Sequence, residues 1–240
     1  MKISNDVANV LADSRVEATE LFLPGVQLER NLYLSVNKVL ESIGGKWNRK
    51  TRSHIFATCP DDIVEMILQT GEYTDAKKEF QFFETPDTLA QELVAMANIK
   101  NGETILEPSA GKGQIAKYLP GCDCIELNVE CRNHLTANGF NVVAEDFLNF
   151  ISKEYDVIVA NPPFSRQQDI DHVTHMIELA NRCIVSVMSA SVLFRDNKKT
   201  NDFRNLVYEC QGTIEPLPDK SFSNNGTNVR TCLVVVDYDK

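Results

Sequence analysis

The second two thirds of the chain alternates short apolar runs with longer segments of helical periodicity. The apolar runs span residues 104–106, 122–125, 141–144, 156–160 and 184–188, and the helical segments between them span 113–119, 129–138, 170–180 and 203–210. Strands that alternate with helices predict βαβ units and a parallel sheet covered on both faces. The tail differs, because two strand-like runs, 212–215 and 229–237, have no helix between them. A final antiparallel hairpin is therefore predicted.

The first 80 residues have a different pattern. Helices are predicted over 5–20, 31–43 and 61–68, and two short strands, 46–48 and 54–57, surround a basic turn. Gly44 and Gly45 end the second of these helices, because glycine accepts the left-handed turn that follows a helix. A polar stretch over 72–79 reads as a linker. We therefore predict a small α+β domain over residues 1–80 and a doubly wound α/β domain over residues 81–240.

Composition narrows the function classes. The chain has 240 residues, 43% of them hydrophobic, and its 24 basic and 34 acidic residues give a net charge of −10. This charge argues against nucleic-acid binding through a general basic coat, although a local basic groove stays compatible with it. No apolar run is long enough for a membrane span and the N-terminus lacks an apolar signal region, so neither a membrane partner nor secretion is predicted.

The cysteines and histidines predict a reduced protein without a metal site. Seven cysteines cannot all pair within one chain, and none form a Cys-x-x-Cys motif. Reduced cysteines are typical of a cytoplasmic protein. His172 and His175 are spaced to share a helix face, but no second pair of ligands accompanies them. No metal ligand is therefore predicted.

A glycine turn follows the first strand of the predicted sheet. It reads Glu107-Pro108-Ser109-Ala110-Gly111-Lys112-Gly113. Ligands of open α/β sheets bind at the carboxyl ends of the strands, and Gly111 and Gly113 would let the backbone approach a ligand closely. The sequence lacks the Gly-Lys-Ser/Thr ending of a nucleoside-triphosphate loop. A purely structural strand-to-helix connection is the alternative.

Acidic residues end the second and third strands. Glu126 follows Glu107 by about 20 residues, the spacing at which a carboxylate binds ribose hydroxyls in nucleotide-binding sheets. Asp146 and Phe147 follow the third strand, where a carboxylate could accept from an exocyclic amine and a ring could stack on a purine. A solvated strand end for Glu126, and a helix cap with a core ring for Asp146 and Phe147, are the structural alternatives.

The fourth strand ends in Asn161-Pro162-Pro163-Phe164. The two prolines lack backbone donors and stiffen the chain, so the Asn161 amide oxygen and the Pro162 carbonyl are available to accept from one amino group. Such acceptors would orient the nitrogen lone pair and offset charge that develops on it. Phe164 could stack on the ring that carries the amine. A proline-rich turn is the alternative.

Taken in order, these motifs resemble those of the DNA adenine-N6 methyltransferases that use S-adenosylmethionine, in the gamma motif order. The resemblance extends over about residues 80–240, and Phe83-Glu84-Thr85-Pro86 resembles the family's segment upstream of the glycine turn. It implies a Rossmann-like class I methyltransferase fold, a mostly parallel sheet with a reversed last strand. It also implies S-adenosylmethionine as cofactor and DNA as partner, with an adenine flipped into the site. Small members of this family are carried by phages and mobile elements, alone or within restriction-modification systems.

The resemblance also implies residue roles. The cofactor would be lined by Glu107, Ser109, Ala110, Gly111 and Gly113, with Thr85 holding its methionine part, Glu126 its ribose, and Asp146 and Phe147 its adenine. The catalytic residues would be Asn161, Pro162, Pro163 and Phe164. The loop 218–228, with Lys220 and Phe222, would border the flipped base, unless it is an ordinary hairpin turn.

Target recognition is expected outside the catalytic region. The printed sequence stops at Lys240, whereas gamma enzymes usually carry a recognition domain after the catalytic one. The stretch 44–54 combines cations with an indole, so Lys46, Trp47, Arg49 and Arg52 are candidate contacts to phosphates and bases. A solvated turn with Trp47 in a small core is the alternative. A partner subunit that supplies recognition is another option.

Other acceptors share the same site chemistry. RNA adenine methyltransferases and enzymes that methylate a protein glutamine also carry Asn-Pro-Pro-aromatic, whereas cytosine-N4 enzymes usually begin this motif with Ser. A cofactor-binding subunit without catalysis is the non-enzyme alternative. The Glu107–Gly111 form of the turn favours DNA over protein, and Asn161 favours adenine over cytosine.

Overall fold

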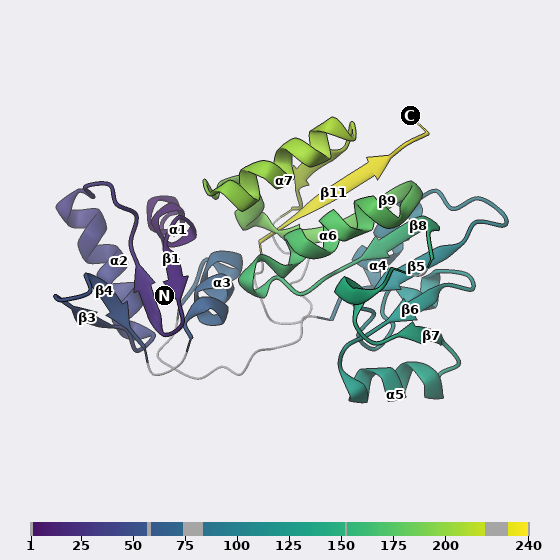
Figure 1. The fold of residues 1–240 in the computed structure, drawn as a ribbon, viewed down its shortest axis with the longest axis horizontal. Coiled ribbons are helices and arrows are strands. Elements are labelled where there is room, and N and C mark those ends of the chain that lie inside the picture. The colour runs from purple at the N-terminus through teal and green to yellow at the C-terminus, as the bar shows by residue number, and fades with distance from the viewer. Residues whose placement is uncertain (1, 57–58, 74–83, 152, 219–229, 240) are drawn as a thin grey trace.

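The computed structural model describes residues 2–56, 59–73, 84–151, 153–218 and 230–239 (Figure 1). They form a four-stranded and a seven-stranded sheet, each with its own helices. The domain boundary predicted near residue 80 lies outside the described residues and stays a prediction. No helix in the described ranges is long and apolar enough to cross a membrane.

The N-terminal residues form the predicted α+β arrangement. Its elements are α1 (Asn5–Ala12), β1 (Arg15–Glu17), β2 (Glu20–Phe22), α2 (Arg30–Ser42), β3 (Lys46–Asn48), β4 (Ser53–Ile55) and α3 (Asp61–Thr70). The strand order is β1-β2-β4-β3, and all pairs are antiparallel. The apolar sides of the three helices and the buried side chain of Leu21 on β2 make one core.

The helix predicted over residues 5–20 is wrong beyond Ala12. Residues 15–22 instead form the β1–β2 hairpin, in which Ala18 takes a left-handed turn with φ 51°. The reason is local, because Arg15-Val16-Glu17 alternates polar and apolar positions with a period of two, which suits a strand with one buried face. The helix predicted over 31–43 is confirmed as α2.

The larger unit has the predicted doubly wound architecture. Its strands are β5 (Ile105–Pro108), β6 (Asp123–Ile125), β7 (Asn141–Ala144), β8 (Tyr155–Ala160), β9 (Ala180–Ser189), β10 (Thr213–Pro216) and β11 (Thr231–Asp237). Its helices are α4 (Asp87–Met96), α5 (Val129–Ala137), α6 (Gln168–Leu179) and α7 (Lys198–Glu209), with short 3-10 turns η1 (Ala116–Tyr118), η2 (Phe147–Asn149), η3 (Ser165–Gln167) and η4 (Ala190–Leu193). The strand order is β10-β11-β9-β8-β5-β6-β7.

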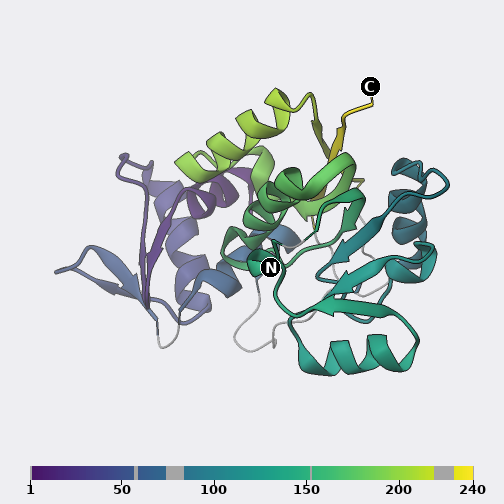
Figure 2. The same cartoon turned by 45° about the vertical axis from the view of Figure 1, so that its right-hand side comes forward.

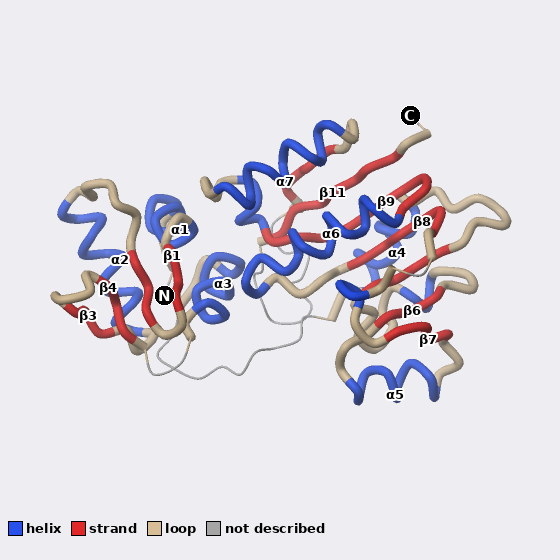
Figure 3. Tube along the Cα trace, viewed as in Figure 1, coloured by secondary structure: helices blue, strands red, loops and turns tan. Residues whose placement is uncertain are grey.

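Strand direction confirms the reversed last strand. The pairs from β7 through β9 are parallel, whereas β11 lies antiparallel between β9 and β10. The predicted terminal hairpin is therefore the β10–β11 pair. In Figure 3 the strands form the central layer of this unit, with helices on both sides.

Each face of the seven-stranded sheet has its own core, which follows from the period of two along the strands. On β8, Val157 and Val159 point to the face covered by α4 and α5, while Ile158 and Ala160 point to the face covered by α6 and α7. Both sets are apolar, so the strands read as continuous apolar runs, as expected for a sheet buried on both faces.

The helix predicted over residues 113–119 is wrong. The segment contains only the 3-10 turn η1, and its backbone is mostly closed by bonds that span three residues. Gly113 has φ +83°, and a Cβ there would meet Leu135 and Phe140 at 3.0 Å. Pro120 follows at once, so little chain is left for a regular helix.

A buried polar junction joins the two units. Glu65 on α3 accepts from Ser189 Oγ at 2.8 Å and Ser191 Oγ at 3.3 Å, and forms a salt bridge with Arg195 at 3.1 Å. Beside it, Asp169 accepts from the Ser189 amide at 3.0 Å. Burial, together with the charge of Glu65, raises the pKa of Asp169 to about 7. Figure 2 shows α3 against the larger unit, where it contacts η3 and η4.

Candidate active site

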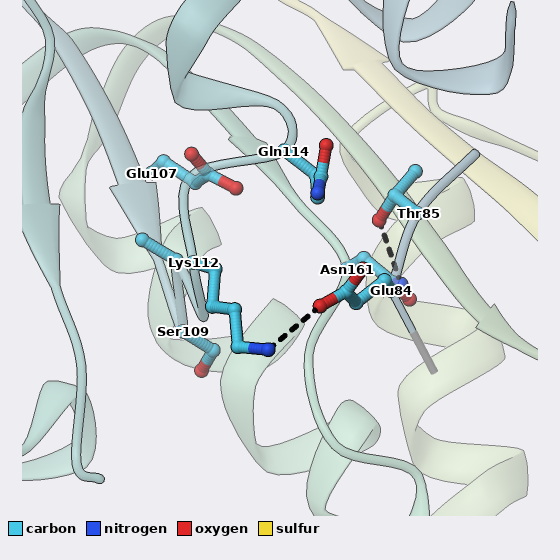
Figure 4. Close-up of a pocket in the computed structure, with 8 residues that line it drawn as sticks. Glu84, Thr85, Glu107, Ser109, Lys112, Gln114 and Asn161 are labelled. Carbon is cyan, nitrogen blue, oxygen red and sulfur yellow. Dashed lines mark hydrogen bonds and ion pairs between the residues drawn. The ribbon is translucent and has the colours of Figure 1, made fainter. Parts of the chain in front are cut away.

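A pocket opens at the carboxyl ends of β5 and β8, where open α/β sheets bind their ligands. The segment before α4 closes it from the third side. The side chains that line it are Glu84, Thr85, Glu107, Ser109, Ala110, Lys112, Gln114 and Asn161 (Figure 4). Five of these were predicted from the sequence as site residues, and they come from three segments far apart in the chain.

Asn161 follows the last residue of β8 and points into this pocket. Its Nδ2 donates to Thr85 Oγ1 at 3.0 Å, which fixes the orientation of the amide. Its Oδ1 is buried and has no hydrogen-bond partner among the described residues. Buried carbonyl oxygens are nearly always paired in folded proteins, so this atom is an acceptor held ready for a ligand donor.

Thr85 precedes α4 but does not cap it, because the N-cap position is Pro86 and no side chain caps the helix there. Instead the Thr85 hydroxyl lies buried against Asn161. The sequence gives no local sign of this contact, because the partners are 76 positions apart.

Glu107 ends in the same pocket and is almost fully buried, at 2% exposure. One carboxyl oxygen, Oε2, has no partner among the described residues, while the backbone amides of Ile115 and Ala116 face the carboxyl group. Burial raises the pKa of Glu107 well above its ordinary value. The side chain is therefore suited to a cationic group, whose charge would favour the ionised carboxylate.

The glycine turn holds these side chains in place. Ser109 and Gly111 both have left-handed backbone, with φ 59° and 56°. A non-glycine residue in this region is uncommon, and such strain concentrates at functional sites. Gly113 was predicted to make room for a ligand, but it faces Leu135 and Phe140, so packing requires glycine here.

Sequence reasoning missed three lining residues. Lys112 reaches across the pocket to Glu84, with Nζ and Oε1 3.2 Å apart, and Gln114 lies beside them (Figure 4). Lys112 and Gln114 belong to the glycine turn or follow it directly, so their place in the motif was the available signal. Their side-chain direction depends on the tight turn that replaces the expected helix.

The acidic residues after β6 and β7 have partners from the protein. Glu126 accepts from the backbone amides of Gly111 and Asn128, each at 2.7 Å, and so links the end of β6 to the glycine turn. Asp146 accepts from the Leu148 amide at 3.0 Å as the cap of η2. Neither lines the pocket. The ribose and adenine roles predicted for them stay predictions.

Phe147 and Phe164 are largely buried rings. Phe147 is 3% exposed and packs against His172 and His175, with ring centroids 5.5 and 4.9 Å apart. Phe164 is 6% exposed and belongs to the core beneath α4. The structural alternative weighed for Phe147, a core ring, matches this packing. Stacking of either ring on a ligand stays a prediction.

The other predicted contacts lie elsewhere. Pro162 is buried and Pro163 is exposed in the segment after Asn161. Lys220 and Phe222 lie outside the described residues. The hairpin residues Lys46, Trp47, Arg49 and Arg52 belong to β3 and the turn that follows it, in the N-terminal unit (Figure 1).

Trp47 is half exposed, and the residues paired with it across the neighbouring strands are buried. It pairs with His54, which in turn pairs with Leu21, the buried residue of β2. The Trp47 and His54 rings lie 5.1 Å apart. The exposed fraction of the indole is 42%, so the ring both packs on the small domain and presents one side to solvent. A nucleic-acid role for this hairpin stays a prediction.

Comparisons with known proteins agree with this architecture. Residues 122–206 match the family model described as "Methyltransferase small domain". The comparison with curated proteins found no match. Among solved structures, the type I restriction-modification methyltransferase subunit of Streptococcus thermophilus is similar, with 17% identity and a TM-score of 0.57 over 75% of this chain and 50% of that one.

Two further structures show the same fold. A modification subunit assigned to a type I restriction enzyme of Vibrio vulnificus has 16% identity and a TM-score of 0.53, over 68% of this chain and 46% of that one. A protein of Listeria monocytogenes assigned to the class I S-adenosylmethionine-dependent methyltransferases has 11% identity and a TM-score of 0.52, over 68% and 64%.

These comparisons settle the fold. The chain spans about half the length of the two restriction-modification subunits. Its larger unit has the Rossmann-like fold of class I methyltransferases, and the family match covers the region from β6 to α7. S-adenosylmethionine is the cofactor of this class of methyltransferase fold.

Proposed function

We propose that this protein transfers a methyl group from S-adenosylmethionine to the N6 amino group of adenine in DNA. The observation that carries the proposal is the unpaired, buried Oδ1 of Asn161, which lies in the same pocket as the unpaired Glu107 Oε2. One atom is an acceptor for an amine, and the other belongs to a carboxyl group suited to a cation.

The pocket fits the cofactor by its donors and acceptors. When bound, S-adenosylmethionine supplies a methyl group activated on a cationic sulfonium. The unpaired Glu107 oxygen would accept from the positively charged amino group of its methionine part, and the turn around Ser109 and Gly111 would border that part. Glu126 is already hydrogen-bonded to Gly111 and so positions this turn.

Asn161 would hold the target amine. Its Oδ1, together with the Pro162 carbonyl, would accept both amine hydrogens and point the nitrogen lone pair at the methyl group. Positive charge develops on the nitrogen during transfer, and a pre-positioned acceptor stabilises it more than the neutral ground state. The bond from Thr85 keeps the amide from rotating, so the oxygen stays in the pocket.

Adenine in DNA is the acceptor class favoured by the motif. The order of motifs, with the glycine turn before Asn161-Pro162-Pro163-Phe164, resembles adenine-N6 enzymes, and Asn rather than Ser opens the tetrapeptide. Similarity to two modification subunits of restriction systems supports a DNA substrate. The hairpin turn 49–52 and a partner subunit are the two candidate sources of target recognition.

The test is methyl transfer from labelled S-adenosylmethionine to unmethylated DNA, with total RNA and a protein lysate as parallel acceptors. Digested DNA is analysed for N6-methyladenine, and Asn161→Ala is the control variant. Label in N6-methyladenine that disappears in the variant supports the proposal. Label only in RNA or protein keeps the site chemistry and rejects the substrate. Cofactor binding without transfer to any acceptor indicates a non-catalytic subunit.

A further inference from the structure

The segment that follows the catalytic tetrapeptide has an unusual backbone. Arg166 and Gln167 both adopt left-handed conformations, with φ 56°, ψ 27° and φ 57°, ψ 34°. Consecutive non-glycine residues in this region are strained, and they persist only where surrounding contacts hold them. This pair lies two and three residues after Phe164, so the strain is stored beside the reacting group.

Gln167 shows what holds the segment. Its Oε1 accepts from Thr200 Oγ1 at 3.1 Å and from Asn197 Nδ2 at 3.3 Å, at the start of α7. Thr200 is fully buried, so this anchor is rigid. The Gln167 side chain is therefore drawn toward α7, while the side chain of Arg166 is exposed.

Arg166 lies five residues after Asn161 and has no direct partner in the described part of the chain. Its guanidinium makes no hydrogen bond or ion pair within the described ranges, and no salt bridge joins it to Asp61, its electrostatic neighbour at the start of α3. The backbone that carries this exposed cation is held in place by the Gln167 anchor, and the free guanidinium is available to an anion.

Arg230 is a second exposed cation at the same edge of the sheet. It precedes Thr231, which pairs with Ser189 at the end of β9, and its carbonyl accepts from the Ala190 amide at 3.1 Å. Arg230 lies two strands and four residues away from Ala160, the last residue of β8, which is a distance on the order of 15 Å. Its guanidinium rests beside Gly71, 3.5 Å from where a Cβ would stand.

We propose that Arg166 and Arg230 bind backbone phosphates of the substrate DNA next to the target nucleotide. This inference rests on the proposed function. A base that enters the pocket must leave the helix stack, so the phosphates next to it need fixed partners. Arginine suits them, because its planar guanidinium matches a phosphate with two parallel hydrogen bonds. The net charge of −10 provides no general attraction, so local cations must supply it.

The test is the salt dependence of DNA binding by the full chain, followed by fluorescence anisotropy on an unmethylated duplex between about 50 and 200 mM NaCl. The slope of log K against log salt is negative, and each lost phosphate contact reduces its magnitude by about 0.9. We expect this decrease for Arg166→Gln and for Arg230→Gln, about twice as much for the double variant, and weaker binding to unrelated sequences by a similar factor.

Two control variants separate the contact from other effects. Arg166→Lys keeps the charge and should keep the slope. Lys100 lies in the loop before β5, at the opposite edge of the sheet, and is an exposed cation paired with Asp239. Lys100→Gln should leave the salt dependence of DNA binding unchanged. Thermal melts of all variants check the fold.

The outcomes distinguish the two claims. Unchanged slopes in Arg166→Gln and Arg230→Gln, with DNA methylation intact in the wild-type chain, reject this inference and leave the proposed function standing. Slopes that fall in these variants while no methyl group reaches DNA support the phosphate contacts and reject the proposed reaction. A wild-type chain whose binding to DNA does not depend on salt rejects the phosphate contacts, and one that also transfers no methyl group to DNA rejects both.

Discussion

The pocket and the junction between the two units use similar side chains in opposite ways. At the junction, both oxygens of Glu65 and both of Asp169 accept hydrogen bonds. In the pocket, Asn161 and Glu107 each keep a buried oxygen without a partner in the described part of the chain. Buried polar groups are costly unless they are paired. The carboxylates of the junction are therefore satisfied, although Arg195 Nε has no partner in the described part of the chain, while the pocket holds unused acceptors for ligands.

Asn161→Ala is expected to have the largest effect and to act on the pocket alone. Removing one pre-positioned acceptor in an active site lowers kcat by about 100- to 1,000-fold. The free energy of unfolding should fall by only about 1 kcal/mol, because the lost oxygen has no partner among the described residues and the one bond lost is that from Nδ2 to Thr85. Single-turnover methylation and urea unfolding measure the two quantities. A large loss of stability with an unchanged rate would contradict the contrast between pocket and junction.

Glu65→Ala should show the reverse. It leaves Arg195 buried without its carboxylate, and breaking a buried pair in this way costs about 3–5 kcal/mol. Urea unfolding measures the change. The double variant Glu65→Met, Arg195→Met leaves no lone charge and should recover most of the stability. If the single variant is as stable as the wild-type chain, the junction does not hold the units together.

Asp169 gives the junction a pH dependence. Its pKa of about 7 in the folded protein exceeds the ordinary value of 3.8, so the folded state binds the extra proton between these values. Stability from this group is therefore fully present below about pH 4 and is lost as pH rises toward and through 7. Asp169→Asn should flatten the stability curve over pH 4–8 by on the order of 4 kcal/mol. Thermal melts across this range measure it, with Asp156→Asn, a half-buried carboxylate whose pKa is lowered by hydrogen bonds from Thr104, as the comparison variant.

Glu107 gives ligand binding in the pocket a pH dependence. Its cause is again the burial of a carboxyl group, but here the ionised form is the one that binds the ligand. The raised pKa of Glu107 means that a cationic ligand must displace a proton. Affinity for S-adenosylmethionine should rise as pH increases from 5 to 7, by up to about tenfold per unit, and a proton should be released. Calorimetry in buffers of different ionisation enthalpy measures that proton. Glu107→Gln should bind more weakly and lose the pH dependence, whereas retention of the full dependence would assign it to another group.

The sequence predicted the sheet better than the details of the site. Apolar runs such as 156–160 are unambiguous, because a strand buried on both faces leaves little other choice for them. Asn161, Glu107 and Ser109 line one pocket because motifs at strand ends converge on one edge of a parallel sheet, and their roles there stay predictions. The helix expected over 113–119 failed because contacts of Gly113 with Leu135 and Phe140, distant in sequence, set the turn.

The junction was not visible from sequence at all. Glu65 lies on an amphipathic helix where an acidic residue reads as solvent-facing, yet its partners come more than 120 positions later. Only the docking of α3 on η4 buries it. Likewise, the hydrogen bond from Asn161 to Thr85 joins two segments that are distant in the sequence, and no local sequence pattern predicts that they meet.

The placement of β11 has a consequence for synthesis on the ribosome. β10 reaches the seven-stranded sheet only through β11, which is made after both β9 and β10 and inserts between them. Until residues 231–237 leave the exit tunnel, β9 presents an open apolar edge and β10 has nowhere to pair. Such an edge is prone to association with other chains. The nascent protein should therefore depend most on chaperones in that interval, and the sheet should close in one late step.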